Sequence, residues 1–308
     1  KFSRTITNHF YNEQLGTDED YVIYIDTDSI FASALPLVKH RYPNENVNSK
    51  PMMTKRILSI ASELQEYLNN SYDYFAQKFC NINEHKFEIK QEVIGISGLF
   101  LAKKRYGMKI INDNGVEVNK MMVKGIDTVR SNFPKACGKL LKEVLDDVLA
   151  NVPKEKIDER ILNFKSSMNT MPIDNISMPT GVKSLSKYVE RKAEGQTFST
   201  FKSGAPVHVK SAVNYNDLLL HFEVSKQYLY ISSAEKIKWV YLTKNPLGIE
   251  SLAYKGYEDP KEILQYIRDY IDYEKMYDKN LFRKIMMFYE VMGWSKPVDK
   301  NFTLERFF

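Results

Sequence analysis

The chain has 308 residues, of which 43% are hydrophobic, and 44 basic against 39 acidic residues give a formal net charge of +5. This length suffices for one large domain or two smaller ones, and the small net charge leaves any nucleic-acid argument to local clusters of charge. Two cysteines, Cys80 and Cys137, are too few for a disulfide framework or a cysteine metal cluster. No apolar run is long enough for a signal peptide core or a membrane span, so we expect a cytoplasmic protein.

The first elements in chain order are predicted to be a helix and a strand. Residues 2–16, FSRTITNHFYNEQLG, are typical of the end of a helix that stops at Gly16. Residues 21–25, YVIYI, alternate as a strand does, which places Tyr21 and Ile23 on the same face.

Two aspartates, Asp26 and Asp28, interrupt this apolar run, which resumes over residues 29–38 and predicts a hairpin with the aspartates in its turn. Aspartate is common in turns, because its side chain hydrogen-bonds nearby backbone groups, so the pair alone is weak evidence of a site. Two carboxylates at a rigid strand tip nevertheless repel each other unless cations neutralise them, and hard oxygen ligands suit Mg²⁺. Two such ions about 4 Å apart stabilise both the attacking and the leaving oxygen of a phosphoryl transfer.

The rest of the chain predicts a β-rich part followed by a helical part. An apolar stripe from residue 54 to about 80 indicates a long amphipathic helix that packs against a sheet. Residues 86–125 indicate several strands, with a hairpin turn at the sequence DNG. Amphipathic helices are expected over 134–152 and 153–170, and residues 262–293 indicate a helix with one or two breaks. This order predicts an α+β fold.

Several segments resemble family B DNA polymerases. Residues 23–31, IYIDTDSIF, resemble the Y-x-D-T-D-S motif of a palm-domain hairpin, with isoleucine where many members have glycine. Residues 102–110, AKKRYGMKI, resemble the K-K-R-Y element, and residues 123–135 resemble the segment between palm and thumb. Residues 205–216 and 270–280 are similar to the thumb of T4-like phage enzymes. The matches keep their order over nearly the whole chain.

The resemblance implies an architecture. It predicts a partial polymerase palm, an antiparallel β-sheet with helices, followed by a mainly α-helical thumb. The expected domains are the C-terminal half of the palm at 1–124, the thumb at 125–300 and a clamp-binding tail at 301–308.

The resemblance also implies roles for single residues. Asp28 is expected to be the principal metal ligand, with Asp26 beside it in the same catalytic site. Glu92 falls where the family often keeps an acidic residue near the metals, although it is also compatible with an ordinary exposed strand position. Lys104 is expected to reach newly made base pairs in the minor groove, whose acceptors are similar for every pair. Tyr106 is expected to position the primer end.

Further DNA contacts are expected from basic and polar residues, because Lys and Arg bind phosphates and helix starts offer backbone amides. These residues are Lys103, Arg105, Lys124, Arg130, Ser131, His208 and Lys210. For Arg105, the alternative is a side chain that points away from the DNA. A short basic cluster is more often a solvated turn, and a lone histidine is more often structural. The surrounding matches favour DNA contact in both cases.

The tail, NFTLERFF, places Leu304, Phe307 and Phe308 at the chain end. Their spacing resembles the clamp-binding peptide of phage and archaeal polymerases, in which apolar side chains enter a pocket of the partner and a tether raises the effective concentration. The alternative is a tail that folds back onto its own protein.

The 308 residues lack the family's D-x-x-S-L-Y-P-like segment with the first catalytic aspartate, its fingers helix and its exonuclease motifs. Three explanations compete: a polymerase split into two chains, a fragment of a longer chain, or a non-catalytic module that binds DNA and tethers a clamp. The paired carboxylates argue against the third. We favour the first.

We therefore expect the C-terminal subunit of a family B DNA-directed DNA polymerase, a nucleotidyltransferase of DNA replication in a phage-infected bacterial cell. It would extend a primer with dNTPs through two Mg²⁺ ions, and only with a partner. The expected partners are primer–template DNA, a subunit or segment with the exonuclease and fingers, and a sliding clamp.

Overall fold

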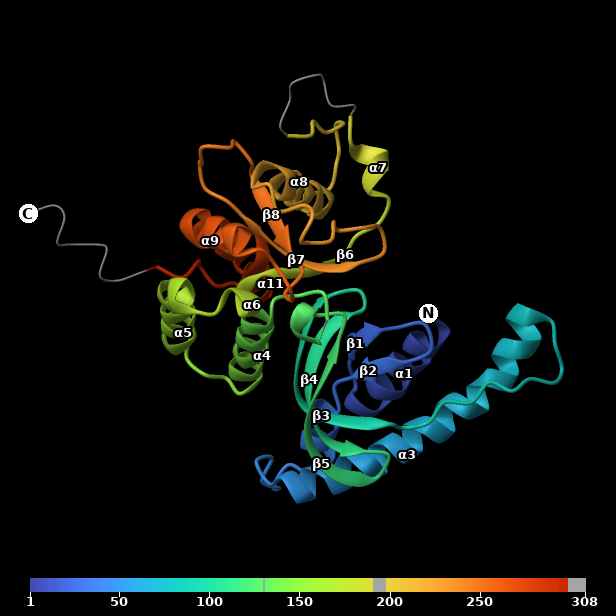
Figure 1. Cartoon of the computed structure of the whole chain (residues 1–308). Helices are drawn as coiled ribbons and strands as arrows, with labels where there is room; N and C mark the ends of the chain where they lie inside the picture. The colour runs from blue at the N-terminus through green and yellow to red at the C-terminus, as the bar shows by residue number, and fades with distance from the viewer. Residues whose placement is uncertain (130, 191–197, 299–308) are drawn as a thin grey trace, which may run out of the picture. The chain divides into compact units, whose positions relative to one another are not determined.

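The computed structural model describes residues 1–129, 131–190 and 198–298 (Figure 1). Contacts between Cα atoms divide the chain into two compact units, Lys1–Gly125 and Ile126–Phe308. Both units combine helices with antiparallel sheet, which confirms the predicted α+β class.

The first unit begins with a helix and a hairpin. Helix α1 (Phe2–Leu15) ends at Gly16 as predicted, and Gly16 has φ 66°, a left-handed conformation that glycine adopts without a steric penalty. Strand β1 (Val22–Ile25) pairs antiparallel with β2 (Ile30–Ala32), which confirms the hairpin.

The second strand is shorter than the apolar pattern suggested, because residues 35–41 form helix α2 (Leu35–Arg41) with a proline in its first turn. The expected alternation is also wrong: Tyr21 is buried but Ile23 is 59% exposed. The pairing shifts by one residue between Val22 and Tyr24, and such a bulge breaks the period of two.

The long helix is confirmed as α3 (Lys50–Phe75), continued by a π-helical turn at Ala76–Cys80. Its apolar stripe packs mainly against α1 and α2, in a core that also includes Ala32 of β2. The buried residues of this core are Phe10, Tyr11, Tyr21, Leu37, Val38 and Ile60. The segment that leads into the next strand runs back along α3 (Figure 1), where Asn69 exchanges two hydrogen bonds with the backbone of Ile89 at 2.8 and 3.1 Å.

Three strands complete the first unit. They are β3 (Val93–Ala102), β4 (Arg105–Asp113) and β5 (Val116–Lys124), in the antiparallel order β3-β4-β5. The DNG sequence forms the β4–β5 turn as predicted. Asn114 and Gly115 both have positive φ there, as a tight hairpin of this kind requires.

The described part of the second unit is mainly helical around one small antiparallel sheet of order β6-β7-β8. Its elements are η2 (Asp127–Val129), α4 (Lys135–Leu149), α5 (Lys154–Ser167), η3 (Met168–Thr170), α6 (Ile173–Ile176), β6 (Met178–Gly181), α7 (Leu185–Tyr188), α8 (Val207–His221), β7 (Lys236–Tyr241), β8 (Ser251–Tyr254), α9 (Lys261–Tyr270), α10 (Tyr273–Tyr277), η4 (Asp278–Phe282) and α11 (Arg283–Met292).

The second unit buries many apolar side chains. Helix α4 buries Leu140, Leu141, Val144 and Leu145, and each such side chain contributes about 1.5–3 kcal/mol of burial free energy. The predicted break in the last helical stretch lies before α10, where the Asp272 side chain accepts a hydrogen bond from the backbone of the helix at 2.8 Å. Within the three described ranges, no helix is both long and apolar enough to cross a membrane.

Candidate active site

The paired aspartates lie in the loop between β1 and β2. Residues 22–32, the acid hairpin, comprise both strands and this loop. The Asp26 N–H donates to the Ser29 carbonyl at 2.9 Å and closes the loop. One carboxylate oxygen of Asp26 accepts the Thr27 N–H at 2.9 Å, and the Asp26 side chain is 21% exposed. Asp28 is exposed at the tip. Asp28 is thus open to a ligand, whereas Asp26 is partly engaged by its own loop.

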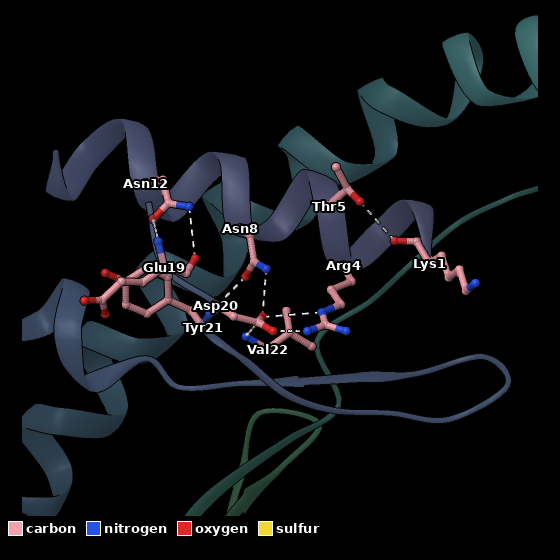
Figure 2. A network of polar contacts seen from close by, with 9 residues as sticks. All are labelled: Lys1, Arg4, Thr5, Asn8, Asn12, Glu19, Asp20, Tyr21 and Val22. Atoms are coloured by element: carbon pink, nitrogen blue, oxygen red, sulfur yellow. Dashed lines mark hydrogen bonds and ion pairs between the residues drawn. The ribbon is translucent and has the colours of Figure 1, made fainter. Parts of the chain in front are cut away.

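A polar network fixes the first strand of the acid hairpin to α1 (Figure 2). The Asp20 carboxylate accepts hydrogen bonds from the Arg4 guanidinium, from Asn8 Nδ2 at 2.7 Å and from the Val22 N–H at 3.1 Å. The Asn8 side-chain oxygen accepts the Tyr21 N–H at 3.0 Å. The bond from Arg4, followed by that from Asn8, lowers the pKa of Asp20 to about 2. The strand that carries the aspartates is therefore held at its start by a charged anchor.

Sequence reasoning missed this anchor, because the residues around Asp20 resemble a plain polar connector. One local signal was present: an aspartate side chain readily accepts a hydrogen bond from the backbone N–H two residues later, as Asp20 does from Val22. The contact with Asn8, twelve positions earlier, has no local signature.

Lys103 and Lys104 of the K-K-R-Y element form the turn between β3 and β4, and Arg105 and Tyr106 begin β4. Residues 103–105 are here called the basic turn. Lys103 and Lys104 are exposed, and Lys104 has φ 61°. The Lys104 N–H donates to the Tyr24 hydroxyl at 2.6 Å, and Lys104 Nζ lies 3.7 Å from a carboxylate oxygen of Asp26. The structure thus brings together two of the predicted site elements, the acid hairpin and the basic turn.

Four aromatic rings join the same two hairpins. Tyr24, Phe31, Phe100 and Tyr106 form this four-ring cluster, with ring centroids 5.3–6.1 Å apart. Such ring pairs contribute about 0.5–1.5 kcal/mol each beyond their buried area. Tyr106 is only 5% exposed, and its burial, followed by the nearby Asp26 charge, raises its pKa. Packing is therefore the visible role of Tyr106, and contact with a primer end stays a prediction.

The basic turn also lies against Gly125, directly after β5. Arg105 Nε donates to the Gly125 carbonyl at 3.3 Å. Gly125 has φ +65°, and a Cβ built on it would lie 2.0 Å from the Lys104 carbonyl oxygen, so only glycine fits there. Lys124, beside it, is exposed and pairs with Tyr106 across the sheet.

A groove of about 1300 Å³ runs through the first unit, and Asp26, Asp28, Glu92, Lys104 and Lys124 all line it. Glu92 is exposed, and its carbonyl accepts the backbone N–H that opens the β4–β5 turn. No group of three His, Cys, Asp or Glu residues placed to hold a metal occurs among the residues the structure describes. Glu92 therefore shares the groove with the aspartates without joining them in such a group.

The groove also exposes apolar side chains. Ile23 is 59% exposed, Ile96 47% and Leu35 40%, and all three line it. Among the described residues, most of the large exposed apolar side chains belong to the first unit, although it is the shorter one.

The remaining predicted contacts belong to the second unit. Ser131 is exposed in the turn before α4. His208 and Lys210 lie in the first turns of α8 and are half-buried, and burial lowers the pKa of His208. The Lys210 ammonium lies 5.8 Å from the centre of the Phe201 ring. Four predicted residues fall outside the described ranges: Arg130, Leu304, Phe307 and Phe308.

The donor set of the acid hairpin fits part of a magnesium site. Asp26 and Asp28 offer hard carboxylate oxygens, and Mg²⁺ is commonly bound through one or two protein carboxylates, with waters and substrate phosphates as the other ligands. Lys104, close to Asp26, offsets part of their negative charge.

The profile of a family described as "DNA polymerase family B" matches residues 4–292. The chain therefore belongs to DNA polymerase family B, as its motifs indicated.

Among its relatives is the DNA-directed DNA polymerase of Enterobacteria phage T4, 24% identical over 310 residues, a match that covers 93% of this chain and 32% of the T4 protein. The DNA-directed DNA polymerase of Escherichia phage RB69 is 29% identical over 164 residues, or 46% of this chain and 17% of that protein. The chain thus spans about a third of the length of its T4 relative.

Proposed function

We propose that this chain forms the second half of the palm (residues 1–124) and the thumb (125–300) of a DNA-directed DNA polymerase. The observation that carries the proposal is the meeting of the acid hairpin with the basic turn, where Lys104 Nζ lies 3.7 Å from Asp26. The relatives in phages T4 and RB69 bear the name of this activity.

In this proposal, Asp28 and Asp26 hold two Mg²⁺ ions together with a carboxylate from outside these 308 residues. The bound ions supply charge stabilisation at the attacking and leaving oxygens of nucleotide transfer. Asp28 is the principal ligand because its carboxylate is exposed, and Asp26 contributes the oxygen that its loop leaves open.

The basic residues hold the primer–template duplex. Lys103, Lys104 and Lys124 are exposed on the first unit, the last two along the groove of the aspartates, and they contact phosphates and the minor groove of any sequence. On the second unit, Ser131 and Lys210 bind backbone phosphates. His208 donates a hydrogen bond to the phosphates as a neutral imidazole, since its lowered pKa disfavours the charged form.

A complementary segment with the first aspartate, the fingers and an exonuclease covers the groove, either as a separate subunit or as part of the same polypeptide. The exposed apolar residues Ile23, Ile96 and Leu35 support this, because such side chains gain stability from burial against a partner. The tail residues Leu304, Phe307 and Phe308 bind a sliding clamp, which the sequence resemblance alone supports.

The experiment replaces Asp28 with alanine in the polymerase assembled with its complementary segment. We expect single-nucleotide incorporation to fall on the order of 10³-fold, since loss of a metal ligand removes several kcal/mol of charge stabilisation. Asp18→Ala, at an exposed aspartate in the connector before β1, is the matched control and should stay close to the unmodified rate. Unchanged incorporation in Asp28→Ala would exclude the proposal and leave a DNA-binding module without chemistry.

A further inference from the structure

The backbone of Lys104 has an unusual conformation and lies close to two distant parts of the first unit. Its φ of 61° is uncommon for a residue with a side chain, and residues of this kind persist only where their surroundings fix them. The Lys104 N–H donates to the Tyr24 hydroxyl at 2.6 Å. On the other side, the Lys104 carbonyl oxygen lies where a side chain at Gly125 would be, 2.0 Å from a Cβ built there.

The Tyr24 hydroxyl is itself fixed in place. Its ring lies in the four-ring cluster, 5.3 Å from Phe100, 5.4 Å from Tyr106 and 6.1 Å from Phe31. The hydroxyl cannot leave the Lys104 amide without moving a ring that three others confine. A rigid group from β1 thus sets the conformation of a turn 80 positions later in the chain.

We infer that Tyr24 is a positioning residue, whose hydroxyl fixes the backbone of Lys104 and thereby places the Lys104 ammonium beside the Asp26 carboxylate. The Lys104 side chain is 62% exposed, and surface pairs of this type are weak on their own. The position of the Lys104 ammonium near Asp26 therefore depends on the Lys104 backbone, which the Tyr24 hydroxyl binds. The consequence for nucleotide transfer rests on the proposed function.

The hydrogen bond itself can be tested without any assay of catalysis. Amide hydrogen exchange in the full polymerase, assembled with its complementary segment, should show a protected Lys104 amide, and Tyr24→Phe should remove that protection. Tyr21→Phe is the matched control, because Tyr21 lies just before the same strand and shares a hydrogen bond with the Thr17 hydroxyl at 2.9 Å. It should leave the Lys104 amide protected. A Lys104 amide that exchanges freely in the unmodified protein would overturn the inference.

The positioning role is tested by a double-mutant cycle on nucleotide incorporation with Lys104→Met, which removes the ammonium and keeps the chain length. Tyr24→Phe should lower kcat/KM about fivefold when Lys104 is present, the size expected for one hydrogen bond, and have almost no effect when Lys104→Met is already in place. Tyr21→Phe should show no such dependence on Lys104. A structural role alone would make the Tyr24→Phe and Lys104→Met effects multiply independently, and that result would refute positioning.

Gly125→Ala reaches the same backbone from the opposite side and serves as the second variant. Gly125→Ala should likewise lower kcat/KM when Lys104 is present and have almost no effect when Lys104→Met is in place. Thermal unfolding of every variant ensures that folded proteins are compared. Independence from Lys104 in either Tyr24→Phe or Gly125→Ala would overturn the inference. Failure of the proposed function is separate: it would show as an Asp28→Ala variant with unchanged incorporation, while the exchange difference at Lys104 would still be observed.

Discussion

The two compact units differ in how they use apolar and charged side chains. The second unit buries whole helix faces, such as the Leu140–Leu145 stretch of α4, and pairs the nearly buried Asp127 with Lys284 at 2.9 Å. The first unit leaves Ile23 and Ile96 exposed along a groove and places its opposite charges on two exposed turns. A unit of the second kind is stabilised by its own core, whereas the surface of the first is suited to be completed by other components.

The difference also concerns how the predicted site residues are placed. In the first unit, a polar anchor, four aromatic rings and one tyrosine hydroxyl position the two turns. In the second unit, His208 and Lys210 depend on the start of a single helix, α8, for their place. We therefore expect substitutions at these sites in the first unit to alter the rate of nucleotide incorporation, and substitutions in the second unit to alter stability or DNA binding.

The largest expected effect tests the self-contained core of the second unit. Leu141→Ala removes a fully buried side chain of α4 and should lower the free energy of unfolding by about 2–5 kcal/mol. The helix itself should persist, because alanine is a strong helix former. Denaturant unfolding measures the change.

The matching change in the first unit is Ile23→Ser at the exposed groove position. It should shift stability by no more than about 0.5 kcal/mol in the chain alone, as at other surface positions. A clear loss should appear only when the complementary segment is bound, and it would be seen as weaker association. Equal effects of Leu141→Ala and Ile23→Ser on the isolated chain would remove the distinction between the units.

A smaller effect is expected from the basic residues at the groove. Lys124→Met should weaken primer–template binding and reduce the slope of log Kd against log salt by about 1, the change for one lost phosphate contact. Lys139→Met on α4 is the control, since Lys139 is 80% exposed and pairs within its own helix with Glu143. Fluorescence anisotropy at several salt concentrations measures both, and an unchanged slope for Lys124→Met would remove it from the DNA-contact surface.

The smallest effect concerns the anchor of the acid hairpin. The pKa of Asp20 is lowered from 3.8 to about 2, so the folded state favours the charged carboxylate. This contribution to stability is fully present above pH 3.8 and is lost as the pH falls through about 2. Asp20→Asn should therefore be less stable than the unmodified protein at neutral pH, with the gap closing as the pH falls through that window. A gap that stays constant as the pH falls from 3.8 to about 2 would contradict the anchor.

Local patterns predicted much of this fold. The acid hairpin, the stop at Gly16 and the DNG turn each depend on neighbouring residues, and all three were confirmed. The predicted strand face of Ile23 was wrong, because the one-residue bulge arises from the pairing of β1 with β2 and not from the sequence of β1 alone.

The candidate site was predictable as two separate motifs, but their contact was not. Tyr24 and Lys104 are 80 positions apart, and nothing in either segment specifies that a hydroxyl of one binds an amide of the other. Asn8 and Asp20 are likewise joined only when α1 and β1 pack together. Sequence patterns indicate which residue types carry chemistry, whereas their mutual distances arise from tertiary packing.

The most direct test of the central claim changes the ligand chemistry at Asp28. Asp28→Cys replaces a hard oxygen with a soft thiolate, which binds Mg²⁺ poorly but accepts softer ions such as Mn²⁺ or Cd²⁺ better. In the assembled polymerase, we predict that this variant loses incorporation with Mg²⁺ and recovers part of it with a softer ion, while Asp18→Cys keeps the unmodified metal preference. Full activity of Asp28→Cys in Mg²⁺ alone would contradict the assignment of the acid hairpin as a metal site.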